Sequence, residues 1–399
     1  GGASESQPFY VNAPYGIVLG HNGNLTNASE LSEVLIREER RHLNTTSDSE
    51  VLLNVLASEL QRVGTPRVTA ADVFAAVSAL YRRCRGAYAV VAMVIGHGIL
   101  GFRDPNGIRP LVLGERDTPK GREYMLASES VALDMLGFGE VRDLAPGEAV
   151  FIDEAGRLHA QQCVATTRHA PCIFEYVYLA RPDTTIAGQS VHATRVRIGK
   201  KLAIEAPVKA DLVIPVPESG TPAAIGYAQE SGIPYGLGLV KNSYVGRTFI
   251  QPSQTIRQLG IRLKLNPLRE IIEGKRIVVV DDSIVRGNTQ RAIVRMLREA
   301  GALEIHVRIS SPPVKWPCFY GIDFATRAEL IASGLEVEEI RRSIGADSLG
   351  YVSAEGLIEA THIPAEKLCT ACFTGKYPIA IPTDLSDGKL RLEILDQNP

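Results

Sequence analysis

Residues 277–289 read IVVVDDSIVRGNT, and this stretch decides the expected fold of the second half of the chain. Its β-branched apolar run predicts a buried strand that ends on two adjacent acids, Asp281 and Asp282. A helical pattern begins near Asn288. Two like charges at the end of a buried strand repel each other, so a metal ion, a cationic or polyhydroxyl ligand, or solvent has to compensate them.

Strand and helix patterns alternate on both sides of this stretch. Helices are predicted at 195–206, 221–231 and 288–301, and strands at 210–216, 275–281 and 304–311. This alternation is typical of a parallel sheet with crossover helices, in which ligands bind beyond the carboxyl ends of the strands. We expect the two acids to lie at such an end.

The turn into the 288–301 helix has the features of a phosphate site. Gly287 frees the backbone, Ser283 and Thr289 supply short polar side chains, and a helix N-terminus offers unpaired N–H groups. Carboxylates beside it can bind ribose hydroxyls or Mg²⁺, so the combination indicates a sugar phosphate. Two alternatives are a solvated strand end and a receiver-type phosphoacceptor domain, although the latter would carry its acids near its own start.

Two further loops point to the same end of the sheet. Residues 213–228, VIPVPESGTPAAIGYA, join a strand to a helix, and Ser219 in this loop could help to hold a second phosphate or a metal. Ordinary turn chemistry with Thr221 as N-cap is the alternative. Residues 241–251, KNSYVGRTFIQ, place Lys241 and Arg247 in a loop that could close over an anionic substrate, or that is simply solvated.

The first part of the chain has a different pattern. Helices predicted at 28–42, 44–60 and 70–84 are followed by strands at 87–95, 98–102, 111–114, 123–128 and 148–153, which suggests an α+β layer sandwich. Before them a strand is expected to run into a tight turn at Asn22 and Gly23, while Ser47 and Glu50 have the spacing of a capping box. The polar segment 165–172 reads as a linker, so we place the domain boundary between residues 165 and 166.

Composition limits the classes of function. A chain of 399 residues favours two domains, and a net charge of -2 provides no basic field for nucleic acid. The most apolar segment, 87–102, is too short to span a membrane and is interrupted by His97. With six cysteines and no visible secretory leader, we expect a cytoplasmic protein without a disulfide scaffold, which turns attention to metal or redox roles for the thiols.

Several long motifs together resemble the amidophosphoribosyltransferase family, the glutamine phosphoribosyl pyrophosphate (PRPP) amidotransferases. They are residues 8–27, 44–50, 103–114, 175–183, 216–228, 241–252, 278–289 and 310–323. The resemblance implies an incomplete α+β sandwich like that of N-terminal-nucleophile hydrolases over residues 1–165, a class II glutamine amidotransferase domain. It implies an α/β type I phosphoribosyltransferase domain with a parallel sheet over residues 166–399.

The implied reaction is the first step of de novo purine (IMP) synthesis. Glutamine is hydrolysed in the first domain, and its ammonia attacks C1 of PRPP in the second, giving 5-phosphoribosylamine and pyrophosphate. The resemblance further implies purine nucleotides as feedback inhibitors and a homotetramer or homodimer. The alternative is a non-catalytic regulator that binds PRPP or a nucleotide on the same fold, although no DNA-binding module is seen.

Carried over residue by residue, the resemblance implies Mg²⁺ ligands at Ser219, Asp281 and Asp282. The cradle for the 5′-phosphate of PRPP falls on Ser283, Ile284, Val285, Arg286, Gly287, Asn288 and Thr289. A mobile catalytic loop falls on residues 241–249, with Lys241, Arg247 and Lys264 facing PRPP. The chain departs from the family at Ser243, where an Arg is usual.

In the first domain, the resemblance implies an oxyanion hole at Asn22 and Gly23 and a contact from Asp48 to the α-amino group of glutamine. From the residues alone, a hairpin turn and ordinary helix-start acidity are the favoured explanations. The family's nucleophile is a cysteine at the start of the mature chain, whereas the first cysteine here is Cys84. We therefore expect an N-terminally truncated form that lacks glutaminase activity and retains only ammonia-dependent synthesis.

The C-terminal tail carries Cys369 and Cys372 at C-x-x-C spacing, and Cys172 and Cys318 could complete a four-thiolate site. Because some family members hold a [4Fe–4S] cluster on cysteines in these contexts, the resemblance implies a cluster here. A structural zinc ion is the alternative. Cys84 and Cys163 are left over, and we expect the two to be buried thiols without a role.

Overall fold

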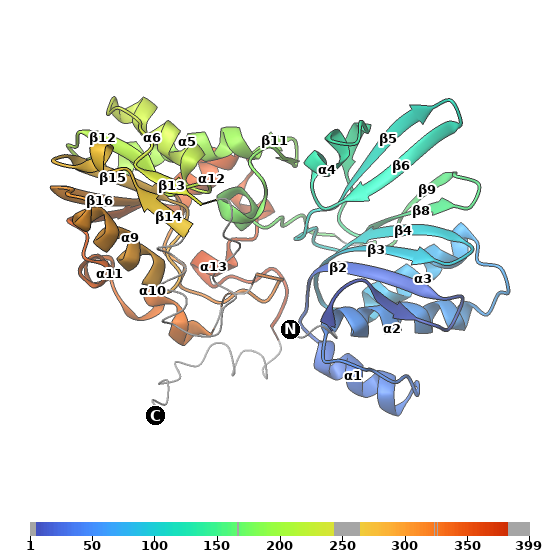
Figure 1. The fold of residues 1–399 in the computed structure, drawn as a ribbon. Helices are drawn as coiled ribbons and strands as arrows, with labels where there is room; N and C mark the ends of the chain where they lie inside the picture. Colours follow the sequence, from blue (N-terminus) through green and yellow to red (C-terminus); the bar gives the residue numbers. More distant parts are fainter. Residues whose placement is uncertain (1–4, 166, 243–263, 323, 325, 382–399) are drawn as a thin grey trace.

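The computed structural model of the protein describes residues 5–165, 167–242, 264–322, 324 and 326–381. Figure 1 shows two parts side by side: antiparallel sheets built from the first 165 residues, and a parallel sheet with helices on both faces built from the rest. The predicted boundary falls between the last strand of the first part, which ends at Gln162, and the next helical segment, which begins at Glu175.

The first part is centred on a six-stranded antiparallel sheet with the strand order β1-β2-β3-β4-β8-β9. These strands are β1 (Phe9–Val11), β2 (Ile17–Leu25), β3 (Gly86–Val94), β4 (Gly98–Arg103), β8 (Glu148–Asp153) and β9 (Leu158–Gln162). A second sheet has the order β6-β5-β7, from β5 (Val112–Thr118), β6 (Gly121–Ala127) and β7 (Gly139–Asp143). The helices are α1 (Ala28–Arg37), α2 (Asp48–Val63), α3 (Ala70–Arg83) and α4 (Ser130–Asp134).

Apolar layers on both faces of the six-stranded sheet hold this part together. Helices α2 and α3 cover one face, where Leu52, Tyr88 and Phe102 are fully buried. On the other face Ala89 and Val150 pack toward the second sheet. The structure therefore confirms the α+β layer sandwich that the order of helices and strands predicted.

Two local predictions in this part are wrong. Asn22 and Gly23 do not form a turn, because β2 continues through them and pairs Gly23 with Tyr88. Gly23 has a φ of 143°, and a Cβ there would lie 1.9 Å from the carbonyl oxygen of Ala87, so this glycine allows close strand pairing instead of a reversal. Ser47 does cap α2, but the Glu50 carboxylate accepts backbone N–H groups of residues 44 and 45 and not that of its cap.

The second part contains a four-stranded parallel sheet with the order β12-β15-β16-β17. The parallel sheet and its first three strands were predicted, whereas β17 was not. Its strands are β12 (Leu212–Pro215), β15 (Arg276–Asp281), β16 (Glu304–Ile309) and β17 (Ser348–Tyr351). Helices α5 (Val191–Glu205) and α6 (Thr221–Ser231) lie on one face, and α9 (Asn288–Glu299) and α11 (Val337–Ile344) on the other. Helices joining parallel strands cover both faces, which explains the nearly continuous apolar run of β15.

Shorter elements complete the second part. They are η2 (Glu175–Leu179), β10 (Thr185–Ile186), β11 (Gln189–Ser190), β13 (Leu239–Lys241), β14 (Leu265–Pro267), α8 (Arg269–Ile272), η3 (Arg327–Glu329), α10 (Ile331–Gly334), α12 (Ala354–Thr361), η4 (Ala365–Lys367) and α13 (Ala371–Thr374). Among them, η2 is a π-helical turn at the junction with the first part.

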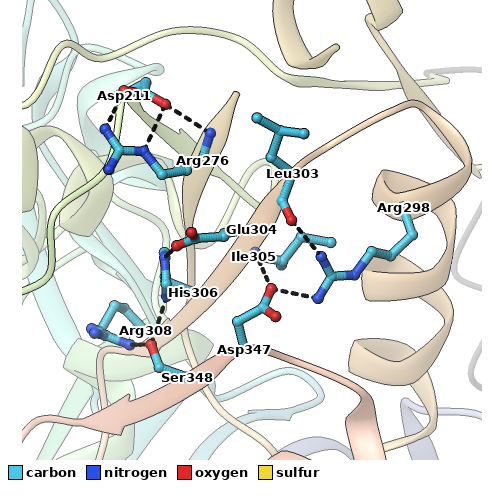
Figure 2. Close-up of polar contacts among 10 residues, drawn as sticks. All are labelled: Asp211, Arg276, Arg298, Leu303, Glu304, Ile305, His306, Arg308, Asp347 and Ser348. Atoms are coloured by element: carbon cyan, nitrogen blue, oxygen red, sulfur yellow. Dashed lines mark hydrogen bonds and ion pairs between the residues drawn. The ribbon is translucent and has the colours of Figure 1, made fainter. Parts of the chain in front are cut away.

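Polar side chains close the amino end of the parallel sheet, as Figure 2 shows. Arg276 at the start of β15 is held by the Asp211 carboxylate through its backbone N–H at 2.9 Å and Nη2 at 2.7 Å. Asp347 accepts the backbone N–H of Ile305 at 2.6 Å, and His306 contacts Ser348 at 2.9 Å. These polar groups at the amino end are therefore paired to one another. The loops that follow β12 and β15 lie at the opposite, carboxyl end of the sheet.

Candidate functional site

Two strand-end loops meet at the carboxyl edge of the parallel sheet. One follows β12 and leads into α6, the other follows β15 and leads into α9, and these two strands are neighbours. The Ser219 side chain lies beside the Asp282 carboxylate, across the two loops. Gly220 makes the approach possible, since a Cβ there would lie 2.3 Å from the carbonyl oxygen of Val280. The structure thus brings together the three predicted magnesium ligands.

The paired acids are buried, with 6% of Asp281 and 7% of Asp282 exposed. Asp281 accepts the backbone N–H of Asp282 at 2.9 Å and the amide of Gln290, while Ser283 donates to Asp282 at 2.5 Å. Burial raises the pKa of both carboxyls, and the negative neighbour adds to the rise at Asp281. Buried oxygen ligands with this unfavourable charge fit a Mg²⁺ ion, which would offset it.

The predicted phosphate cradle forms the turn from β15 into α9. Gly287, at φ 78°, is the N-cap residue of α9, and a Cβ there would also lie 2.8 Å from Ile331 Cδ1. Ile284 is buried in the core and Arg286 pairs with Glu329 at 2.9 Å. Backbone N–H groups and the side chains of Asn288 and Thr289 are therefore the groups available for an anion, while the Ser283 hydroxyl donates to Asp282 and the side chain of Ile284 is buried.

The third predicted loop is fixed at its two ends. β13 pairs with β14 in antiparallel register, and the Lys264 carbonyl accepts the backbone N–H of Asn242 at 2.8 Å. Lys241 Nζ lies 3.2 Å from the Glu218 carboxylate, which places this ammonium beside the loop that carries Ser219. Arg247 and Ser243, between these ends, lie outside the described residues.

A surface depression of about 240 Å³ lies between β14 and the carboxyl end of α9. It is lined by Leu265, Asn266, Pro267, Arg269, Met296, Glu299 and Ala300. Because the predicted phosphate turn is at the other end of α9, this depression is not part of the candidate site.

A second candidate site lies on β2 in the first part. Asp48, the first residue of α2, accepts the backbone N–H of Leu25 at 3.0 Å and lies 3.9 Å from His21 Nδ1. Asp48 therefore lies beside the strand that carries Asn22 and Gly23, the other two residues that the resemblance assigns to the glutamine site. Burial lowers the pKa of His21, whose Nδ1 contacts Ser49 at 3.0 Å.

A buried ion pair at this site is not predicted by the sequence. Nη2 of Arg109 lies 3.0 Å from Glu175 Oε1 in the second part and donates to Asn22 Oδ1 at 3.3 Å. The sequence feature that could have pointed to this pair is the position of Arg109 in the motif at residues 103–114, where a charged residue stands among Gly and Pro. Nothing in that spacing identifies a partner 66 residues further along, at the start of η2.

The loop that carries Arg109 is held by its own first residues. Arg103 donates to the carbonyls of Arg109 at 2.7 Å and Gly107 at 2.8 Å. Asp104 accepts the backbone N–H groups of Asn106 and, at 3.2 Å, of Arg109. These bonds satisfy the buried backbone of the loop and fix the direction in which the Arg109 side chain leaves it.

The four cysteines of the predicted metal site lie in one apolar cluster at the junction. The backbones of Cys172 and Cys369 pair in an isolated parallel β-bridge, and both thiols are free. Cys318 Sγ accepts the backbone N–H of Tyr320 at 3.3 Å. Burial raises the pKa of Cys369 to about 12, and the cysteine neighbours also raise the pKa of Cys372. Within the described ranges, however, no group of three or more His, Cys, Asp or Glu side chains has the geometry to hold a metal ion.

The other two cysteines, Cys84 and Cys163, are buried in the first part, as predicted. Burial raises the pKa of both thiols. A raised pKa keeps a thiol protonated and unreactive, so neither residue has the character of a nucleophile.

Two family models match the two parts of the chain. Residues 2–135 match a glutamine amidotransferase domain, and residues 196–310 match a phosphoribosyl transferase domain. Among the described helices, none is both long and apolar enough to cross a membrane. The fold and the matches define an enzyme of the pentosyltransferase class that joins an amidotransferase domain to a phosphoribosyltransferase domain.

Curated relatives narrow the class to one family. The amidophosphoribosyltransferase of Mycobacterium tuberculosis (strain H37Rv) is 55% identical over 404 residues, covering 97% of this chain and 73% of the relative. That of Escherichia coli K12 is 53% identical over 364 residues, covering 90% and 72%. The chain belongs to the amidophosphoribosyltransferase family.

Solved structures agree with this assignment. A glutamine PRPP amidotransferase from B. subtilis, complexed with ADP and GMP, matches with a TM-score of 0.84 and 44% identity. The match covers 96% of this chain and 82% of that one. The expected fold, with an amidotransferase sandwich followed by a phosphoribosyltransferase domain, is therefore confirmed.

Proposed function

We propose that this chain transfers an amine to C1 of PRPP, releasing pyrophosphate and forming 5-phosphoribosylamine, the first step of purine (IMP) synthesis. One observation carries the proposal: the buried Asp281 and Asp282 lie where the loop of Ser219 and Gly220 packs against the end of β15, directly before the N-terminus of α9. Hydroxyl and carboxylate oxygens next to a helix N-terminus suit a ligand that has both a metal-bound pyrophosphate and a phosphate.

In this proposal each end of PRPP has its own partners. Ser219, Asp281 and Asp282 would hold a Mg²⁺ ion, which when bound stabilises negative charge on the departing pyrophosphate oxygens. Backbone N–H groups of residues 283–289 would bind the 5′-phosphate. Lys241, Lys264 and Arg247 would supply positive charge toward the pyrophosphate, and their loop would exclude water from C1.

The first domain would bind glutamine and supply ammonia. Asn22 and Gly23 would donate to the oxyanion of a tetrahedral intermediate, and Asp48 would hold the α-amino group of glutamine. The nearest cysteines in sequence to these residues, Cys84 and Cys163, are buried thiols with raised pKa values. For a polypeptide of these 399 residues we therefore propose that ammonia, and not glutamine, is the amine donor.

We also propose a metal centre on Cys172, Cys318, Cys369 and Cys372, with [4Fe–4S] preferred and zinc as the alternative. The four cysteines belong to one buried apolar cluster, and a cation that drew their sulfur atoms together would stabilise the thiolate forms. When bound, such a centre would fasten the tail at 369–372 to the junction. Since the B. subtilis relative is complexed with ADP and GMP, we propose that purine nucleotides also bind this chain. From the family resemblance alone, we propose a homotetramer or homodimer.

The test is release of pyrophosphate from PRPP by the purified 399-residue protein. We expect release that requires Mg²⁺ and ammonium salt, that stops with EDTA, and that glutamine does not support. No release from folded protein supplied with metal would overturn the proposal and favour the second candidate, a PRPP- or nucleotide-binding regulator. Release with glutamine alone would overturn only the choice of donor.

A further inference from the structure

One guanidinium links the two domains at the glutamine site. Arg109 extends from the loop after β4, and Glu175 opens the π-helical turn η2 of the other domain. Their side chains pair at 3.0 Å, with only 5% of Arg109 and 4% of Glu175 exposed. The same Nη2 donates to Asn22 Oδ1 at 3.3 Å, so a single group contacts both domains.

This contact decides which way the Asn22 carboxamide points. A carboxamide has an accepting oxygen on one side and a donating NH₂ on the other. Since the oxygen of Asn22 is directed to a cation, its NH₂ is directed away from Arg109. An oxyanion hole needs the donor end of the amide, so the Arg109 contact selects the useful orientation.

Glu175 is itself fixed by the second domain. Arg195 of α5 donates to the backbone carbonyls of Tyr176 at 2.7 Å, Ala180 at 2.8 Å and Glu175 at 3.3 Å. These bonds hold the π-helical turn in place, because the guanidinium supplies hydrogen bonds to carbonyl groups in and just after the turn. The anion that holds Arg109 therefore has its position set by a helix of the phosphoribosyltransferase domain.

We propose that Arg109 is a positioning residue that orients Asn22, and that Glu175 holds Arg109 in place from the other domain. The donor end of the glutamine site is then assembled only while the η2 turn is docked against the first domain. This inference rests on the proposed role of Asn22 in the oxyanion hole. Arg109 and Glu175 are not proposed to touch the substrate.

The test follows the side-chain NH₂ signals of Asn22 by NMR in asparagine-labelled protein, with Asn22→Asp used for assignment. In Glu175→Gln the shape is kept but the charge is lost, and in Arg109→Lys the charge is kept but the planar fork is lost. We expect the Asn22 signals to shift or broaden in both variants. Because the measurement needs no turnover, a failure of the proposed amine transfer would not affect its outcome.

Two controls separate positioning from a general loss of structure. Glu148→Gln breaks an ion pair with Arg142 of 2.7 Å inside the first domain and should leave the Asn22 signals unchanged. Asn24, whose Nδ2 donates to the Phe319 carbonyl at 2.9 Å, reports whether the junction is intact. Asn22 signals that do not move in either variant would overturn the proposal. So would equal changes at Asn24, since those would indicate that the whole junction had opened.

Discussion

Gly321 of the phosphoribosyltransferase domain lies backbone to backbone against Gly23 of the amidotransferase domain. A Cβ on Gly321 would come within 2.7 Å of Gly23 Cα and 2.9 Å of its carbonyl oxygen. Gly321 also has a φ of 103°, which L side chains rarely adopt. The strand that carries the proposed oxyanion hole is therefore in direct contact with the other domain, and a side chain at this point would separate them.

We expect Gly321→Ala to lower the free energy of unfolding by roughly 2–4 kcal/mol, from backbone strain together with overpacking. Denaturant unfolding measures the change. Gly121→Ala is the matched control, because Gly121 has a similar φ of 120° but no atom within 4 Å of the point where a Cβ would lie. Equal losses in the two variants would show that backbone strain alone, and not the domain contact, is responsible.

The sequence predicts most of the fold because its patterns are local. The apolar run before Asp281 and the helical period after Gly287 are enough to place β15 and α9, and alternation then implies the parallel sheet. The prediction of a turn at Gly23 is wrong for the same reason: Asn-Gly favours tight turns locally, but pairing with the whole length of β3 outweighs that preference.

Contacts between residues far apart in the sequence cannot be predicted from the local sequence patterns at the candidate sites. The Arg109–Glu175 pair joins two loops whose meeting depends on how the domains dock. A charged residue in a Gly- and Pro-rich segment is usually exposed, so burial of this arginine becomes visible only in three dimensions. By contrast, the contact of Ser219 with Asp282 was predictable, because neighbouring parallel strands bring their loops together.

Asp281→Asn should make the metal-free protein more stable at neutral pH. Both carboxyls have raised pKa values in the folded state, so the folded protein binds protons at these sites more tightly than the unfolded chain does. As the pH rises, the two carboxyls ionise and the free energy of unfolding falls. The substituted amide keeps an acceptor for the N–H of Asp282, and Gln290 can turn its Oε1, which has no partner among the described residues, toward the new NH₂.

The expected gain is roughly 1–2 kcal/mol near pH 7.5 in EDTA, and it should shrink as the pH falls toward the ordinary carboxyl range. Mg²⁺ should stabilise the natural protein and not the variant, whose transferase activity should be lost. Thermal unfolding at several pH values, with and without Mg²⁺, measures these effects. A variant that is less stable than the natural protein at every pH would contradict the reasoning.

Lys241→Met should weaken PRPP use without affecting folding. The ion pair of Lys241 with Glu218 is largely exposed at the glutamate, which has 80% of its side chain accessible, so releasing the ammonium costs little. A charged hydrogen bond to a phosphate oxygen is worth about 1.5–3 kcal/mol, so kcat/KM for PRPP should fall by about 10- to 100-fold.

Lys209→Met is the control for Lys241→Met, since Lys209 is exposed and lies before β12, at the amino end of the sheet. Ammonia-dependent pyrophosphate release at varied PRPP concentration measures the effect. Unchanged kcat/KM in Lys241→Met would remove this residue from the proposed substrate contacts.

Cys372→Ser should abolish metal binding, whereas Cys163→Ser should not. Cys372 is buried in the same apolar cluster as the other three cysteines, and burial followed by the neighbouring cysteines raises its pKa, so four thiolates are stable together only around a cation. Cys163 belongs to the core of the first domain. Elemental analysis and visible absorbance of protein purified without oxygen decide the outcome: iron and sulfide with broad absorbance indicate a cluster, and zinc without colour indicates the alternative. If the natural protein retains neither metal, or if both variants retain the same metal content, these four cysteines are a packed thiol cluster and not a metal site.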